Sequence, residues 1–165
     1  MPERQHAVNR KKQRSPAGDA FSLVAFQILR LGGLLSAAGD ELAAPSGQSS
    51  ARWQVLAAVE NAPTTVATIA RALGLARQSV QRVADLLADE GLAVYRDNPD
   101  HARAMLLELT ARGRAALATI QRAQRAWADR LGAAIGESDL RRTAAVLERI
   151  AAEVSGDPSG RGAAR

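Results

Sequence analysis

The sequence predicts a mainly α-helical fold with one small β-hairpin, and three observations indicate it. Hydrophobic residues make up 47% of the 165 residues but aromatic residues only 3%, and the abundant Ala, Leu and Arg favour helices over a sheet-rich architecture. Apolar residues recur at steps of three and four along most of the chain, which is the helical period. They alternate with other residues only between about 92 and 109, which predicts two short strands.

The first helix is expected over about residues 19–38. Its main apolar stripe consists of Phe21, Val24, Ile28, Leu31 and Leu35. Because apolar residues also lie on its other sides, we expect this helix to be buried both by its own protomer and by a partner chain. Asp19, Gln27 and Arg30 interrupt the apolar stretch, so we interpret it neither as a signal peptide nor as a membrane span.

Three shorter helices should follow a loop over residues 43–47. Their predicted ranges are about 50–60, 66–73 and 77–90. Ser49 or Ser50 caps the first of them and Thr65 caps the next, while Gly74 and Gly91 end the last two.

The predicted hairpin follows, and its tip is the turn-rich segment 97–103. Thr110 should cap a long fifth helix that ends at Gly136, and a sixth helix follows Ser138. The side chains of the sixth helix expected to point inward are Leu140, Leu147, Ile150 and Val154.

The third and fourth helices carry the spacing of a helix-turn-helix. Ala70 lets two helices cross closely, Gly74 can adopt the left-handed conformation of a sharp turn, and Val80 fills the angle between the helices. Any tight helical hairpin can show this spacing, so the spacing alone does not indicate DNA binding. The residues on the outward face of the fourth helix are needed for that inference.

The first two turns of that helix hold donor-rich side chains on the outward face. These side chains are Arg77, Gln78, Ser79, Gln81 and Arg82. A helix in the major groove presents its N-terminal residues to base edges, where Arg suits guanine and Gln suits adenine. The alternative is an ordinary solvated polar face. The pattern predicts binding to double-stranded DNA.

The hairpin supplies the second element, a wing beside this recognition helix. Arg103 is the expected contact to phosphate or the minor groove, Asp100 would orient it as a carboxylate partner, and Arg96 would add a backbone contact. His101 is expected to be an ordinary exposed turn residue. The expected fold class is therefore mainly α with a small β-hairpin wing, a winged helix-turn-helix.

The net charge and the chemically reactive residues exclude several classes of function. The net charge of +5 suits an anionic partner, and much of the excess lies in residues 1–18. Because the chain has no cysteine and only two distant histidines, His6 and His101, we expect no thiol chemistry, metal site or cofactor. The sequence contains no paired nucleophile and base and no phosphate-binding loop, so we expect that the protein is not an enzyme. We also expect a soluble cytoplasmic protein.

Over roughly residues 20–154 the sequence resembles the MarR family of winged helix-turn-helix regulators. The motifs that carry the resemblance are residues 65–70, 73–87, 90–92, Asn98-Pro99-Asp100 through Arg103-Ala104, and Leu109-Thr110 with Gly113. The resemblance implies a homodimer formed by the terminal helices, Arg82 and its neighbours in the major groove, and Arg103 as the wing arginine. It also implies repression at an inverted-repeat operator, with release by a small, often phenolic ligand.

Two positions depart from the family pattern. Ala76 stands where Ser or Asp commonly caps the recognition helix, and Ala102 stands where many members have a second wing arginine. For a small aromatic or other apolar effector, the candidate residues are Phe26, Arg30, Arg52 and Trp53.

The predicted organisation has five parts. They are a disordered basic arm over 1–18, a dimerisation helix and loop over 19–48, the DNA-binding domain over 49–110, C-terminal dimerisation helices over 111–154 and a disordered tail over 155–165. The alternatives to a sequence-specific regulator are a winged-helix protein–protein adaptor, which would show an apolar fourth helix, and a nonspecific architectural DNA binder, which would have no preferred palindrome.

Overall fold

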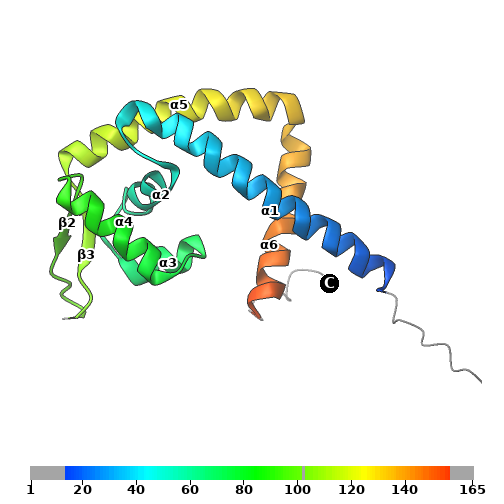
Figure 1. The fold of residues 1–165 in the computed structure, drawn as a ribbon, viewed down its shortest axis with the longest axis horizontal. Helices are drawn as coiled ribbons and strands as arrows, with labels where there is room; N and C mark the ends of the chain where they lie inside the picture. Colours follow the sequence, from blue (N-terminus) through cyan, green and yellow to red (C-terminus); the bar gives the residue numbers. More distant parts are fainter. Residues whose placement is uncertain (1–13, 102, 157–165) are drawn as a thin grey trace, which may run out of the picture.

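The computed structural model describes residues 14–101 and 103–156 (Figure 1), so most of the expected basic arm, Ala102 and most of the expected tail lie outside the described residues. The helices are α1 (Pro16–Ala43), the 3₁₀ turn η1 (Ala44–Ser46), α2 (Ser50–Ala58), α3 (Val66–Leu73), α4 (Arg77–Asp89), α5 (Ala111–Ile135) and α6 (Glu137–Ser155). The strands are β1 (Thr64–Thr65), β2 (Ala93–Arg96) and β3 (Leu106–Leu109).

One hydrophobic core joins α2, α3, α4 and the sheet to the first half of α5. Its largest fully buried side chains include Leu56, Ile69, Leu87, Leu107 and Leu117. Each comes from a different element, so this core fixes the position of α4 relative to the strands. Figure 1 shows these elements as one lobe, with α1, the distal half of α5 and α6 extending away from it.

Side-chain caps set most helix starts, as the sequence predicts. The N–H groups of Arg52, Thr68 and Gly113 donate to the hydroxyls of Ser49 (3.3 Å), Thr65 (3.2 Å) and Thr110 (3.1 Å), respectively. The first helix begins earlier than predicted and runs five residues further, to Ala43. Its early start follows from a Ser15 cap and Pro16 in the first turn, where proline is tolerated.

The turn between α3 and α4 has the expected left-handed residue. Gly74 has a φ of 65°, and the Leu75 N–H donates to the Ala70 carbonyl across it (2.9 Å). Ala76 then begins α4 in an extended conformation without a side-chain cap. The recognition helix therefore starts with unsatisfied N–H groups.

Replacing Ala76 with serine is expected to stabilise the free protein by about 1 kcal/mol, because the hydroxyl would accept a bond from an N–H in the first turn of α4. Thermal or urea unfolding measures this change. The control is Ala72→Ser, an exposed position within α3 that has no cap to supply. Equal effects of the two substitutions would contradict the capping explanation.

The hairpin belongs to a three-stranded antiparallel sheet of order β1-β3-β2. Tyr95 of β2 and Thr64 of β1 both pair with Leu107 on the central strand. The third strand, β1, is an addition to the predicted hairpin. Two residues cannot show an alternating pattern, so this strand forms only because β3 offers it an edge.

The sheet is joined to α5 through one close backbone approach. Thr110 donates its hydroxyl proton toward the carbonyls of Gly91 (2.7 Å) and Leu92 (3.2 Å), while its oxygen accepts the Gly113 N–H. A Cβ on Gly113 would lie 1.9 Å from the Leu92 carbonyl oxygen. Only glycine fits there, which explains the Thr-x-x-Gly spacing at the start of α5.

The terminal helices are the least buried part of the described chain. Only Gly39 and Ala43 are buried in α1, and no described residue of α6 is. The expectation that Leu140, Leu147 and Val154 point inward is wrong for a single chain, in which they are 39%, 38% and 73% exposed, and Ile150 is half-buried. By length and composition alone, α1 is also apolar enough to cross a membrane.

Candidate nucleic-acid interface

The donor-rich face of α4 lies on the surface of the lobe. Arg77, Gln78, Ser79 and Arg82 are exposed, and Gln81 is half-buried. The opposite face buries three residues in the core: Val80, Ala84 and Leu87. The side chains predicted from the sequence thus lie on the outward side of one helix, and the opposite side of that helix is packed into the hydrophobic core.

A groove of about 230 Å³ separates α4 from the wing. Arg77 and Gln81 line it from α4, Tyr95 from β2, and Arg103 from the segment before β3. The structure therefore brings the predicted wing arginine and the recognition helix to the two sides of one concave surface. Arginine on both sides of the groove suits binding of the anionic sugar-phosphate backbone of a nucleic acid along the groove.

A hydrogen-bond network joins two residues of this groove, Gln81 and Tyr95, to Asp85. The Gln81 amide nitrogen donates to Asp85 Oδ1 and to Tyr95 Oη, both at 2.8 Å, and the Tyr95 hydroxyl lies 2.7 Å from Asp85 Oδ1. Burial, followed by the hydrogen bond to Asp85, raises the pKa of the Tyr95 phenol above its usual value. No sequence pattern indicated a role for Tyr95, although it is the only tyrosine in the chain.

The wing differs from expectation in its polar contacts. Asp100 forms no ion pair with Arg103 among the described residues, and its backbone N–H instead donates to the Asn98 side-chain oxygen in a turn (3.0 Å). Arg103 is exposed, with its backbone N–H donating to His101 Nδ1 (3.3 Å). Arg96 is paired with Glu108 on the neighbouring strand (3.1 Å). The Arg103 guanidinium is thus left facing solvent.

A second network joins the end of α4 to its neighbours. Arg52 of α2 forms a two-pronged ion pair with Glu90, at 2.9 and 2.6 Å. Arg112 of α5 donates to the Glu90 carbonyl (2.8 Å). Arg52 therefore supports the recognition helix, because its guanidinium is engaged with Glu90 at the end of α4.

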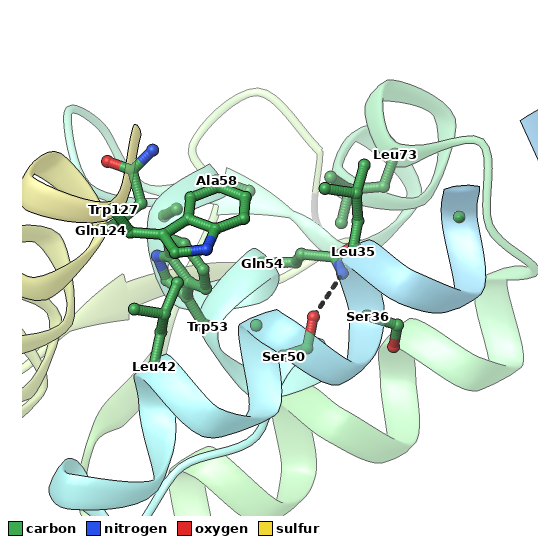
Figure 2. A pocket seen from close by; sticks show the side chains of 13 residues that line it. Leu35, Ser36, Leu42, Ser50, Trp53, Gln54, Ala58, Leu73, Gln124 and Trp127 are labelled. Atoms are coloured by element: carbon green, nitrogen blue, oxygen red, sulfur yellow. Dashed lines mark hydrogen bonds between the residues drawn. The ribbon is translucent and has the colours of Figure 1, made fainter. Parts of the chain in front are cut away.

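A pocket of about 600 Å³ lies between α1, α2, α3 and α5 (Figure 2). Trp53 and Trp127 line it, and Gln54 and Gln124 are among its few polar groups. Figure 2 shows the Gln54–Ser50 hydrogen bond (3.3 Å) within it. Of the four sequence candidates, Trp53 alone is found in this lining, whereas Phe26 and Arg30 are exposed on α1.

The sequence profile of the MarR family matches residues 46–104, which span α2, the helix-turn-helix and most of the wing. Uncharacterized protein Rv2011c of Mycobacterium tuberculosis is 39% identical over 132 residues, covering 80% of this chain and 92% of that protein. The chain belongs to the MarR family. MarR-family proteins are transcription regulators that bind DNA and are not enzymes.

Two solved MarR-type structures support the same fold and class. The transcriptional regulator MosR of M. tuberculosis, solved in complex with DNA, is 27% identical, with 79% of this chain and 96% of MosR covered at a TM-score of 0.66. The transcriptional repressor CouR, bound to a 23-mer DNA duplex, is 26% identical, with coverages of 84% and 99% and a TM-score of 0.70. The predicted fold class and family are confirmed.

Proposed function

We propose that this MarR-family chain is a cytoplasmic, sequence-specific repressor that binds an inverted-repeat operator as a homodimer. The observation that carries the proposal is the exposed, donor-rich N-terminal half of α4 beside Arg103 across one groove. In this arrangement α4 enters the major groove and Arg103 contacts the flanking backbone or minor groove. Phosphate contacts position the protein, while Arg77, Gln78, Ser79, Gln81 and Arg82 read base edges.

The dimer is proposed from the unpartnered apolar surface of the terminal helices. Large side chains of α1 are exposed in the single chain: Phe21, Leu23, Phe26, Leu29, Leu31, Leu34 and Leu35. An apolar surface that extends along a whole helix is rare on a monomer and marks an association site. A second copy pairing its own α1, α5 and α6 with this surface would bury it. It would also place two α4 helices about 34 to 36 Å apart for one operator.

Release by a small effector is proposed at the pocket of Figure 2. The pocket touches α1 and α5, which belong to the dimerisation region, as well as α2 and α3 of the DNA-binding lobe. A ligand wedged there would change the angle between the lobe and the dimer. The lining contains no charged side chain and has Trp53 and Trp127, which suits a small aromatic or other apolar molecule.

Arg82→Ala is expected to weaken operator binding by about 1 to 3 kcal/mol and to relax preference at one base pair of each half-site. The reason is that Arg82 is exposed on the outer face of α4 and its guanidinium has no ion-pair partner among the described residues. Titration of the intact operator and of single-base variants measures both changes. Unchanged discrimination between them would remove Arg82 from the base-reading set.

Arg103→Ala is expected to weaken binding to all sequences alike. Each lost phosphate contact should reduce the slope of log affinity against log salt by about 0.9. Affinity measured over a salt series on operator and unrelated DNA tests this. Arg96→Ala is the matched wing control, because the Arg96 guanidinium is already paired with Glu108. An unaltered slope for Arg103→Ala would contradict its role as a phosphate contact.

A further inference from the structure

The pocket of Figure 2 combines aromatic rings with a few uncharged polar groups. The chain has two tryptophans, and both Trp53 of α2 and Trp127 of α5 line this pocket. Each is half-buried, so part of its surface is available to a bound molecule. Indole rings bind flat aromatic molecules by stacking or edge contacts. A volume of about 600 Å³ has room for a molecule with two fused rings.

Two polar side chains of the lining have unused hydrogen-bonding capacity. Ser50 is 5% exposed, and its hydroxyl accepts from Gln54 (3.3 Å) but donates to no group within residues 14–101 and 103–156. The half-buried Gln124 amide forms no hydrogen bond within the same residues, whereas the Gln121 amide donates to Glu60 (2.8 Å). Because polar groups that lose water without gaining a partner cost free energy, Ser50 and Gln124 favour a ligand that both accepts and donates hydrogen bonds.

The charges at this pocket do not favour an ionic ligand. No described residue of its lining is Arg, Lys, His, Asp or Glu. The N-terminus of α2 is the positive end of that helix and would otherwise attract an anion. Asp40 of α1 already occupies this terminus, since its Oδ1 accepts the Ser50 N–H (2.6 Å). A ligand carboxylate beside Ser50 would therefore lose water without meeting a cation, and a ligand cation would meet no carboxylate in the lining.

We propose that the pocket binds an uncharged, flat aromatic molecule that carries a carboxamide or lactam group, and that it discriminates against aromatic carboxylates of the same shape. An amide offers its oxygen to the Ser50 hydroxyl and its N–H to the Gln124 oxygen. The rings of the ligand pack against Trp53 and Trp127. The inference rests on the proposed effector site, and it names the class of molecule that occupies that site.

The test uses three probe molecules that share one shape and differ in charge: 2-naphthamide, 2-naphthoate and 2-naphthamidinium. Binding to the full-length protein is followed by NMR through the indole N–H signals. Because Trp53 and Trp127 are the only tryptophans, both signals report on this pocket. At neutral pH, 2-naphthamide should shift both signals and bind about tenfold or more tightly than either ion, because only the ions lose charge hydration without a partner.

Substitutions of Gln124 test the hydrogen-bonding and charge requirements separately. Gln124→Leu keeps a side chain of similar size without the amide, and it should weaken 2-naphthamide about five- to tenfold. Gln121→Leu is the matched control, because Gln121 lies on the same helix with its amide bound to Glu60. It should bind 2-naphthamide like the wild type. Gln124→Arg supplies a cation and should reverse the preference, so that 2-naphthoate binds more tightly than 2-naphthamide. Thermal unfolding establishes that each variant is folded.

Three results would overturn the inference. The first is a wild-type protein in which an ionic probe binds as tightly as 2-naphthamide or more tightly. The second is the absence of any indole shift with all three probes at millimolar concentration. The third is a folded Gln124→Leu or Gln124→Arg protein with wild-type affinity for both 2-naphthamide and 2-naphthoate.

Operator titration with and without 2-naphthamide separates this inference from the proposed function. A bound amide that leaves operator affinity unchanged would exclude release by this class of effector, while the class of ligand would stand. A protein that binds 2-naphthamide as expected but selects no DNA sequence would overturn the proposed repressor function alone. Sequence-selective binding to an operator, together with any of the three results above, would leave the repressor function standing and remove only the ligand class.

Discussion

Replacing Gly113 with alanine is expected to destabilise the folded chain by about 3 kcal/mol or more, at the upper end of what overpacking costs. The added Cβ would lie 1.9 Å from the Leu92 carbonyl oxygen and 3.0 Å from its carbon. Neither atom can rotate away, because Leu92 leads directly into β2 and its carbonyl also accepts the Thr110 N–H (3.1 Å). Urea or thermal unfolding measures the loss.

The control for this prediction is Gly132→Ala in the same helix. A Cβ on Gly132 meets nothing within 4 Å in the single chain, and alanine favours a helix over glycine by up to about 1 kcal/mol. The control should therefore be neutral or stabilising. Similar unfolding midpoints for the two variants would show that the sheet and α5 separate more easily than their contact distances indicate.

Replacing Leu29 with glutamate is expected to convert the proposed dimer into monomers. Leu29 is 78% exposed in the single chain and lies outside the hydrophobic core, so the charge should leave the DNA-binding lobe folded. At a dimer interface the same carboxylate would be desolvated without a partner. Losing one of two linked half-site contacts should lower operator affinity about 10²- to 10⁴-fold.

Light scattering and operator titration of the same samples test this expectation. Gln27→Glu adds the same charge to the same helix at a position that is already polar, and it should stay dimeric. Circular dichroism confirms that both variants keep their helices. A Leu29→Glu protein that remains a dimer with wild-type affinity would exclude this part of α1 from the interface.

The outcome for α6 shows where sequence periodicity reaches its limit. The apolar stripe of Leu140, Leu147, Ile150 and Val154 predicts a helix, and the helix is present at Glu137–Ser155. The stripe does not indicate what covers it, and in the single chain most of it faces solvent. A helical period indicates only that one face of the helix is buried. That face can be buried equally well by the same chain or by a second chain.

The sequence by itself determined the features that depend on neighbouring residues. The hydroxyl caps at Thr65 and Thr110, the left-handed turn at Gly74 and the donor-rich face of α4 follow from residues within a few positions of one another. The tertiary structure decided how distant groups share hydrogen bonds. It engaged Arg52 with Glu90, 38 positions away, and Gln81 with Tyr95, 14 positions away. Such pairings depend on how the core packs whole elements together, and no local pattern encodes that packing.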